Sequence, residues 1–481
     1  MSKSCTCFQN YNQEIEKLLL AISLIQNQSP KSSARSLQKK PPDVREQTFL
    51  LLREAELTGA DLGLLINEVI NKTQLERRDQ ALMTELVYGV FRQRALLDWW
   101  IDQFARLKRV KKKIRVILRL ALYQVIFLDR IPDYAIVNSA VNLAKTAEGL
   151  GAGRFVNGLL RNVIRSKDTL PQPDAKHPIQ AIAILTSHPV WMVKRWVSRW
   201  GMEKTRRLCE SNNLTPPMTL RVNRLKTTRD ILMTALIAEG GRVEVALLSP
   251  DALSVKGLSV ATLAAFKRGE FYIQDEGAQL TAHLLGAKAG ECILDLCAAP
   301  GGKTSHLAEL TAGKAQIIAT DRSAARLLLL KENLERLQSP NVHIMPLSEA
   351  LSENRQYDRI LVDAPCSALG ILRRIPEGKW SKKEKMIQAY PKIQLEILNE
   401  VVAYLKPGGY LLYVTCSTER EENEVVAENF LMEHPEMERD NLSLLLPVSA
   451  RKYVDESGYF TSTFNSDNID RFFAVRWRKT R

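Results

Sequence analysis

The sequence predicts a multidomain chain with an all-α domain, a small α+β module and an α/β domain, in that order. Its 481 residues correspond to about three domains at roughly 150 residues each. Apolar residues recur every three or four positions over the first third of the chain, whereas short apolar runs alternate with helical segments after Phe271. The content of 45% hydrophobic and 25% charged residues is typical of a soluble globular protein.

We place the domains at residues 42–175, 176–270 and 271–481, after an N-terminal extension of residues 1–41. The extension combines a short amphipathic stretch with a Ser-, Lys-, Gln- and Pro-rich tract, which predicts a poorly ordered segment. No run approaches the ~20 apolar residues of a membrane helix, and no cleavage site follows the apolar stretch Leu18–Ile25. We therefore expect a cytoplasmic protein without a membrane partner, and a monomer, since no feature demands more.

Charge and cysteine content narrow the class of partner. The 68 Lys and Arg against 54 Asp and Glu give a net charge of +14, which favours a polyanion such as nucleic acid or an acidic membrane surface. The seven cysteines show no repeated spacing, so a disulfide framework is not expected. No second Cys or His pair stands at zinc-site distance from Cys5 and Cys7, and we expect no metal.

The helical periodicity between Val44 and Arg165 predicts the all-α domain. Within it, the segment Arg106–Arg119 carries eight Lys or Arg and no acid. One interpretation is a solvated helix face balanced by acids elsewhere. The other, which the overall positive charge favours, is a face that contacts RNA phosphates.

The next region mixes helices and strands. We expect a strand at Met218–Val222, a helix at Thr228–Glu239 and a strand at Arg242–Leu248, which together indicate a small α+β module. Three tryptophans precede them near helical spacing, and such a stripe is more typical of a core than of a base-stacking surface. They are Trp191, Trp196 and Trp200.

After Phe271, five apolar strands alternate with helices, which predicts a doubly wound, mostly parallel sheet. One of the helices is expected at Lys392–Leu405, where Pro407 and two glycines follow. The strands are expected at Cys292–Leu296, Gln316–Asp321, Val342–Leu347, Arg359–Asp363 and Tyr410–Thr415.

A glycine-rich turn, CAAPGGKT over Cys297–Thr304, follows the first of these strands and leads into a helix. Glycines let a ligand approach the backbone, and a helix N-terminus favours an anion. A P-loop would need Gly at the position of Cys297, and the dinucleotide pattern GxGxxG is absent. A nucleoside with a carboxylate remains, and S-adenosylmethionine fits, with Asp321 placed to receive ribose hydroxyls.

Two cysteines follow the fourth and fifth strands, at the sheet edge that also carries the glycine turn. Carbon 5 of cytosine is a poor nucleophile, but a thiolate that adds to carbon 6 converts the ring into an enamine that can accept a methyl group. Such chemistry needs a nucleophilic thiol, an acid at the pyrimidine edge and a group that assists release. Cys366, Cys416 and Asp363 meet these needs, although the residues alone do not order the two thiols.

A basic segment with a tryptophan comes directly after Cys366. Residues 372–376 and 379–383, with Trp380, could hold RNA phosphates and a splayed base. The competing interpretation is a solvated basic loop.

At these motifs the chain resembles the Sun/Fmu family of RNA cytosine-C5 methyltransferases, whose catalytic domain has a Rossmann-like fold. Two upstream segments, Leu220–Lys226 and Ile273–Gln279, look like the family's RNA-binding module and the start of its catalytic domain. The motifs are DLCAAPGGKT at Asp295–Thr304, DAPCSALG at Asp363–Gly370, RRIPE at Arg373–Glu377, TCS at Thr415–Ser417 and EEN at Glu421–Asn423.

The helical region resembles the NusB-like RNA-binding domain. This domain before a Sun/Fmu catalytic domain is the architecture of the RsmB group, which implies 16S rRNA, naked or in a partly assembled small subunit, as the partner. The resemblance runs from about residue 42 to the C-terminus, and three motifs carry it in the helical region: Glu85–Arg92, Ile131–Asn138 and Arg154–Asn162.

The family resemblance also implies the role of each site residue. Cys416 would be the nucleophile, and Cys366 would assist product release. After the third strand the family usually has an acid that reaches the adenine, whereas this chain offers Ser348 and a displaced Glu349. The methyl donor would lie against Cys297, Ala298, Ala299, Pro300, Gly301, Gly302, Lys303, Asp321 and Asp363.

Three hypotheses for function follow. The leading one is an S-adenosylmethionine-dependent cytosine-C5 methyltransferase that acts on 16S rRNA. A second keeps the reaction and moves it to tRNA. A third is a non-catalytic RNA-binding or antitermination-type factor that has kept the methyltransferase fold.

Overall fold

The computed structural model describes residues 43–73, 75–105, 110–352, 355–464 and 467–480, so the N-terminal extension lies outside the described residues. The described chain divides into two compact units. A helical unit contains residues 43–216 and the segment Ile371–Ile387, and an α/β unit contains Pro217–Gly370 and Gln388–Arg481. No helix in the described ranges is both long enough and apolar enough to cross a membrane.

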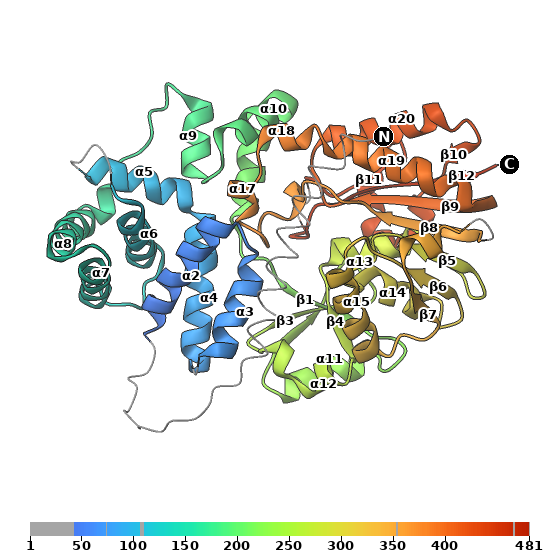
Figure 1. Cartoon of the computed structure of the whole chain (residues 1–481), viewed down its shortest axis with the longest axis horizontal. Coiled ribbons are helices and arrows are strands. Elements are labelled where there is room, and N and C mark those ends of the chain that lie inside the picture. The colour runs from blue at the N-terminus through green and yellow to red at the C-terminus, as the bar shows by residue number, and fades with distance from the viewer. Residues whose placement is uncertain (1–42, 74, 106–109, 353–354, 465–466, 481) are drawn as a thin grey trace. The chain divides into compact units, whose positions relative to one another are not determined.

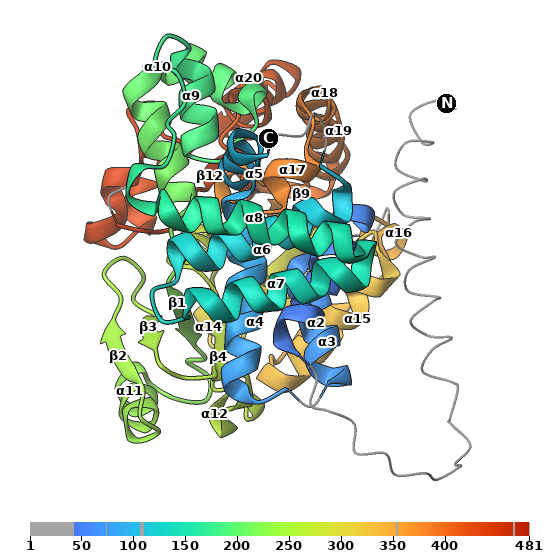
Figure 2. The same ribbon diagram turned by 90° about the vertical axis from the view of Figure 1, so that its left-hand side faces the viewer.

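Helix α6 forms the centre of the helical unit. Apolar residues lie on nearly every side of it, and most of its side chains from Ile114 to Val125 are buried, as expected for a helix surrounded by others. Figure 2 shows α6, α7 and α8 side by side. The helices of this unit before Pro217 are α2 (Val44–Thr58), α3 (Leu62–Lys72), α4 (Arg77–Arg92), α5 (Arg94–Phe104), α6 (Lys112–Phe127), α7 (Asp133–Glu148), α8 (Leu150–Arg165), α9 (Pro178–Leu185) and α10 (Val190–Asn212).

The basic run at the start of α6 is balanced by acids from neighbouring helices. Lys111 and Lys113 pair with Glu148 at 2.7 and 3.5 Å. Arg115 pairs with Asp98 and Asp102, at 3.2 and 2.6 Å. Residues 106–109 lie outside the described residues. The pairing of Lys111, Lys113 and Arg115 agrees with the solvated-face interpretation for these residues, and contact of this face with RNA phosphates stays a prediction.

The segment Ile371–Ile387 packs within the helical unit and contains α17 (Gly378–Ser381) and α18 (Glu384–Ile387). The Lys379 side chain is fully buried, and its Nζ donates to the carbonyls of Arg92 and Ser187, both at 3.2 Å, and to Asn213 Oδ1 at 2.6 Å. The prediction that this segment presents a basic RNA-binding loop is therefore wrong for Lys379.

Trp380 and Glu377 anchor the same segment. The Trp380 indole donates its Nε1–H to the carbonyl of Phe91 at 2.8 Å. The Leu62 N–H donates to Glu377 Oε1 at 3.2 Å. Trp380 therefore serves as an anchor in the helical core, not as a platform for a splayed base.

Lys379 generates a pH-dependent prediction. Burial lowers the pKa of Lys379 to about 7. Because the unfolded chain holds this proton up to about pH 10.5 and the folded chain does not, the folded state gains stability as pH rises from 7 to 10. We expect Lys379→Met to cost about 1–3 kcal/mol at neutral pH through its three unpaired acceptors. The deficit should widen toward pH 9.5, as measured by urea unfolding.

Lys385→Met is the matched control, because Lys385 lies in the same segment and is exposed. It should follow the native protein at both pH values. An equal deficit of Lys379→Met at pH 7.5 and pH 9.5 would show that Lys379 stays charged in the folded state.

The α/β unit begins with a small antiparallel sheet in the order β2-β3-β1-β4. Its strands are β1 (Met218–Val222), β2 (Arg242–Val245), β3 (Ala252–Lys256) and β4 (Phe271–Ile273). Helices α11 (Arg229–Ala238) and α12 (Ala264–Lys267) accompany it. The predicted strands and helix of the α+β module are thus present, whereas α9 and α10, which the sequence interpretation placed in the same module, belong to the helical unit.

The large sheet has the order β10-β12-β9-β8-β5-β6-β7, with β11 paired to β12. The five predicted strands are parallel neighbours, which confirms the predicted fold class. The antiparallel strands β10 (Met437–Arg439), β11 (Phe460–Thr461) and β12 (Phe473–Lys479) complete one edge (Figure 1). The parallel strands are β5 (Cys292–Asp295), β6 (Gln316–Ala319), β7 (Val342–Ile344), β8 (Tyr357–Asp363) and β9 (Leu405–Thr415).

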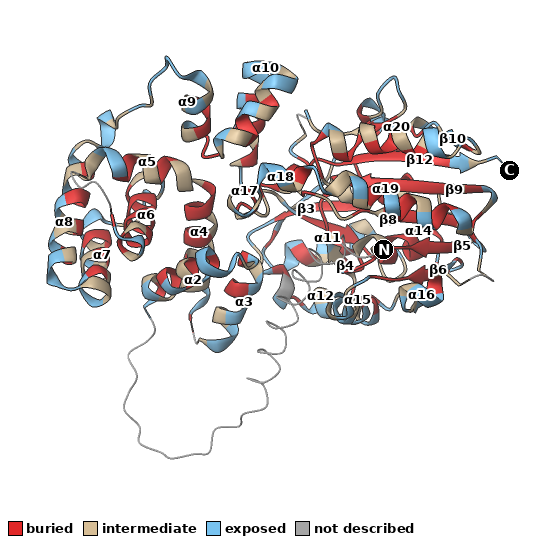
Figure 3. Ribbon diagram, turned by 45° about the horizontal axis from the view of Figure 1, so that its top comes forward, coloured by how far each residue is buried: buried red, intermediate tan, exposed pale blue. Residues whose placement is uncertain are grey.

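Figure 3 shows the strands of the large sheet buried between helices whose outer faces are exposed. Buried aliphatic and aromatic side chains from β8, β9 and β12 form its core, as a sheet covered on both faces requires. The helices of this domain are α13 (Glu276–His283), α14 (Gly302–Leu310), α15 (Ala324–Leu337), α16 (Leu347–Ala350), α19 (Tyr390–Val401) and α20 (Glu424–Glu433).

Arg221 of β1 joins the small sheet to α14. Its side chain is fully buried and forms a bidentate pair with Glu309, with N–O distances of 2.7 and 3.0 Å. The same guanidinium donates to Ser305 Oγ at 2.8 Å, to Gln274 Oε1 at 2.6 Å and to the carbonyl of Gly302. This side chain therefore ties the module to the first turn of α14 through neutral and charged acceptors alike.

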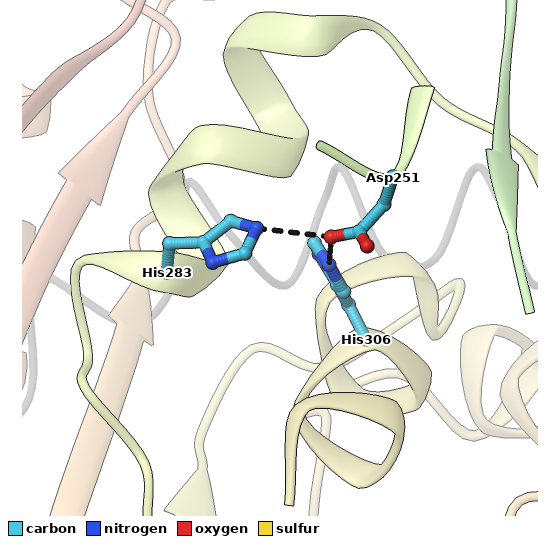
Figure 4. Close-up of side chains that lie close together, drawn as sticks. All are labelled: Asp251, His283 and His306. Atoms are coloured by element: carbon cyan, nitrogen blue, oxygen red, sulfur yellow. Dashed lines mark hydrogen bonds and ion pairs between the residues drawn. The ribbon is translucent and has the colours of Figure 1, made fainter. Parts of the chain in front are cut away.

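A second junction joins the turn before β3 to α13 and α14 (Figure 4). His283 Nε2 and His306 Nε2 lie 3.0 and 3.1 Å from the same oxygen, Asp251 Oδ2. The contacts hold the pKa of Asp251 well below its usual range even though burial opposes this. The carboxylate is ionised and can only accept, so both imidazoles donate from Nε2.

These residue types also bind zinc, but the geometry favours a hydrogen-bonded junction. A metal-bound histidine normally donates its second ring N–H to a partner. The Nδ1 of His306 is buried and has no hydrogen-bond partner in the described structure. If the proton moved from Nε2 to Nδ1, the Nδ1–H would be a buried donor without an acceptor.

The buried imidazole of His306 makes the α/β unit sensitive to acid. Burial, with the Arg221 charge, lowers the pKa of His306 to about 3. The unfolded chain takes up this proton near pH 6.5 and the folded chain only near pH 3, so acidification over this window favours unfolding. When the pH falls from 7.5 to 5, we expect the free energy of unfolding of His306→Gln to fall by about 1–2 kcal/mol less than that of the native protein.

The measurement is the thermal midpoint at several pH values, with the exposed His343→Gln as control. His343→Gln should keep the acid sensitivity of the native protein. Parallel curves for the native protein and His306→Gln would refute a neutral, buried His306.

Candidate active site at the carboxyl edge of the large sheet

The turns that follow β5, β6, β8 and β9 meet at the carboxyl edge of the large sheet. The strand order reverses between β5 and β8, because β6 and β7 extend one way and β9 the other. In open α/β sheets such a switch point forms a crevice that binds ligands. The predicted residues of the glycine turn, the strand-end acids and the two cysteines all come from these turns.

The glycine turn after β5 leaves no room for side chains at its two glycines. Gly301 has a φ of +102°, and a Cβ there would lie 2.9 Å from Leu330 Cδ1. A Cβ on Gly302 would lie 3.0 Å from Tyr272 Cε1. Asn333 Nδ2 holds the carbonyl of Pro300 from outside at 3.0 Å. The positive φ favours glycine at Gly301, and a side chain at Gly302 would require Tyr272 to shift.

A pocket of about 160 Å³ lies against this turn. Seven of its lining residues were predicted from the sequence to contact the methyl donor, whereas Tyr272, Gln274 and Asp295 were not. Tyr272 lies in β4 of the small sheet and Gln274 directly follows this strand, and only Gln274 falls within the motif Ile273–Gln279. The lining residues are Tyr272, Gln274, Asp295, Cys297, Ala298, Ala299, Pro300, Gly302, Lys303 and Asp363.

Asp295 ends β5 beneath the pocket and is fully buried. Thr304 Oγ1 donates to its Oδ2 at 2.6 Å, whereas its Oδ1 has no hydrogen-bond partner in the described structure. Burial raises the pKa of Asp295 to about 7. A buried oxygen without a partner at the wall of a pocket is suited to a donor group on a ligand.

Asp321 and Glu349 are not among the residues that line the pocket. Asp321 follows β6, pairs with Arg326 at 3.1 Å and accepts the Ser323 N–H at 3.1 Å. Glu349 lies in α16, is exposed and faces Arg355 at 3.9 Å. Neither Glu349 nor Ser348 contributes to the pocket that the described residues form.

Lys303 and Asp363 both line the pocket and form an ion pair, with Nζ and Oδ2 2.6 Å apart. The Lys303 ammonium also lies 5.4 Å from the centre of the Phe472 ring. Burial alone would lower the pKa of Lys303, but the Asp363 carboxylate raises it above its usual value. Lys303 therefore stays charged and offers a fixed cation close to Cys416.

Cys366 and Cys416 meet with their sulfur atoms 3.4 Å apart, and both are free thiols. The hydrogen bond with Cys366, together with burial, raises the pKa of Cys416 well above its usual value, while the Lys303 charge opposes this shift. Cys416 therefore rests as a neutral thiol. Burial, with the carboxylates of Asp321 and Asp363, raises the pKa of Cys297 to about 12, which makes it a poor nucleophile.

A glycine-rich turn, a strand-end acid and a pocket at the switch point of this sheet define a Rossmann-like methyltransferase domain. Known proteins agree with that class. The family models that match are 16S rRNA methyltransferase RsmB/F over residues 282–478, the NusB family over 42–165, and the RsmF/B-like methyltransferase ferredoxin-like domain over 188–260.

Two relatives match this chain over nearly all of their own length. The probable ribosomal RNA small subunit methyltransferase B of Bacillus subtilis (strain 168) is 37% identical over 92% of this chain and 99% of its own. The ribosomal RNA small subunit methyltransferase B of Pasteurella multocida (strain Pm70) is 36% identical over the same shares. The crystal structure of PH0851 superposes with a TM-score of 0.73 at 26% identity, over 92% of this chain and 100% of that one.

The chain therefore belongs to the ribosomal RNA small subunit methyltransferase B family. The NusB-like domain and the rRNA methyltransferase class predicted from sequence motifs are confirmed.

Proposed function

We propose that this chain transfers a methyl group from S-adenosylmethionine to carbon 5 of a cytosine in 16S rRNA, through a covalent bond between Cys416 and carbon 6. The observation that carries the proposal is the contact between two free thiols, 3.4 Å apart, beside the Lys303–Asp363 pair. Methylation of an exocyclic nitrogen would not need these thiols, because such a nitrogen attacks directly. Carbon 5 needs prior activation by a nucleophile.

The residues of the pocket fit the methyl donor. The cradle formed by Gly301 and Gly302 excludes side chains, and the α14 N-terminus suits a carboxylate. Asp295 offers an unpaired buried oxygen to a donor group of the ligand. When bound there, S-adenosylmethionine supplies an electrophilic methyl group. The sequence predicts that Asp321, which follows β6, accepts hydrogen bonds from the ribose hydroxyls of the donor, and the proposal includes this role.

The thiols and their neighbours would share the chemistry. Cys416 loses its proton and adds to carbon 6, and the Lys303 charge favours the thiolate. Asp363 hydrogen-bonds the pyrimidine edge. The electron pair of the C5=C6 bond takes the methyl group from the sulfonium of the donor, which leaves as a neutral thioether. Solvent then takes the carbon 5 proton, the C–H electron pair forms the C5=C6 bond again, and the bond between carbon 6 and the Cys416 sulfur breaks so that Cys416 leaves as a thiolate. Cys366 assists this release, a role that rests on the family motif.

Family membership favours rRNA over tRNA as the substrate. The relatives with nearly complete coverage are small subunit rRNA methyltransferases, and the NusB family model covers residues 42–165. The contact between the thiols argues against a purely RNA-binding factor, because RNA binding alone needs no thiol. We propose 16S rRNA, naked or in a partly assembled subunit, as the partner.

A transfer assay with labelled methyl donor tests reaction and substrate together. Small-subunit rRNA and bulk tRNA are offered side by side and then digested to nucleosides. We expect 5-methylcytidine from rRNA alone. Label in tRNA alone would contradict the substrate and keep the reaction, and label in another nucleoside would contradict the thiol mechanism.

Single substitutions test the order of the two cysteines. We expect Cys416→Ala to lower the rate by about 10³-fold or more, since a nucleophile is removed. Cys366→Ala should trap a protein–RNA adduct that survives denaturing electrophoresis. Cys292→Ala is the matched control, because Cys292 starts β5 away from the edge where the thiols lie. An adduct with Cys416→Ala and none with Cys366→Ala would reverse the assigned roles.

A further inference from the structure

One buried carboxylate, Glu422, bridges the two turns that carry the thiols. It lies in the short helix Arg420–Glu422 after β9 and is fully buried. Its Oε2 accepts the backbone N–H of Ser367 at 2.7 Å and the Nε2–H of Gln394 at 3.2 Å. Its Oε1 accepts the hydroxyl of Ser417 at 2.7 Å. Ser367 and Ser417 are the residues that directly follow Cys366 and Cys416.

The serine hydroxyls close this bridge into a ring. The Ser367 and Ser417 oxygens lie 3.0 Å apart. Since Ser417 gives its only hydroxyl proton to Glu422, Ser367 must donate to Ser417. The backbone of the helix is fixed too, because the Tyr413 hydroxyl donates to the carbonyl of Glu422 at 2.6 Å. The Ser417 oxygen also accepts the backbone N–H of Glu419 at 3.1 Å, which further fixes this hydroxyl.

The ring lies where the sheet no longer holds the two turns together. The parallel register of β8 and β9 ends at the pair Asp363 and Val414. Beyond it, the Ala364 N–H donates to the Val414 carbonyl at 2.9 Å and the Gly370 N–H donates to the Cys416 carbonyl at 2.8 Å. Cys366 and Cys416 lie beyond the last pair of the register. Their 3.4 Å separation therefore depends on bonds outside the strand ladder.

Stability alone gives little reason for an acid at this position. All three side-chain bonds of Glu422 come from neutral donors, and burial raises its pKa. A buried carboxylate without a cation is costly unless every lone pair is used. A carboxylate has two oxygens, so Oε1 can accept from the Cys416 turn while Oε2 accepts from the Cys366 turn. One residue can therefore hold both turns.

We propose that Glu422 is a positioning residue that holds Cys366 and Cys416 at the separation the reaction needs. This rests on the proposed function of the two thiols. Glu422 does not contact the pocket, so it acts only through Ser367 and Ser417. A misplacement of about 1 Å at a reacting group can lower a rate by about 10²-fold.

Glu422→Gln tests the proposal, because glutamine keeps the volume and presents a donor to Ser367 N–H and Gln394 or to Ser417. We expect kcat to fall by about 10²-fold, with the KM for RNA and for the methyl donor within threefold. Glu428→Gln on the exposed face of α20 is the matched control and should keep the native kcat. A Glu422→Gln kcat within threefold of native would overturn the proposal.

Oxidation by diamide measures thiol positioning without methyl transfer. Diamide takes up the two thiol hydrogens as Cys366 and Cys416 join in a disulfide, which mass spectrometry quantifies. We expect native protein and Glu428→Gln to close this bond at the same rate and Glu422→Gln to close it at least tenfold more slowly. Equal rates in all three would overturn the positioning role. If Glu422→Gln forms the disulfide more slowly but the native protein methylates no RNA, only the proposed function is contradicted.

Ser417→Ala provides a second route if Glu422→Gln does not fold. It removes the bond from the Cys416 turn to Glu422 and leaves the Ser367 N–H bond in place. We expect the same two deficits, smaller in size, and less than additive effects when both changes are combined. Additive effects, or native behaviour of Ser417→Ala in both assays, would contradict the bridge.

Discussion

The catalytic edge depends on one buried guanidinium. Arg221 uses its donors on Glu309, Ser305, Gln274 and the Gly302 carbonyl, so the start of α14 is fixed by a residue from another sheet. A lysine has neither the fork geometry nor the number of directed donors to replace it. The pocket consequently needs both sheets: the small one gives Tyr272 and Gln274, and the large one gives the glycine turn.

Local patterns were enough to predict the parallel strands, the glycine turn and the two thiols. Each depends on residues adjacent in sequence: an apolar run, a run of small residues, a cysteine at a strand end. The burial of Lys379 could not be predicted, because its acceptors Arg92 and Asn213 lie 287 and 166 residues away. The antiparallel strands β10 and β12 were missed because edge pairing is set by tertiary contacts rather than by alternation.

The thiols show how far geometry and family evidence each reach. Geometry brings Cys366 and Cys416 into contact and places the Lys303 charge near Cys416, but it does not by itself assign the two roles. The assignment of nucleophile and release group comes from the TCS and DAPC motifs.

The packing of Ile371–Ile387 within the helical unit has a consequence for how this protein can be divided. The chain crosses between the two units at Pro217, at Ile371 and again at Gln388, so a single cut does not separate them. A catalytic fragment that begins at Pro217 would carry Lys379 without any of its acceptors. An exchange of helical units between relatives would have to include the segment Ile371–Ile387. The boundary of the helical unit is therefore discontinuous in the sequence.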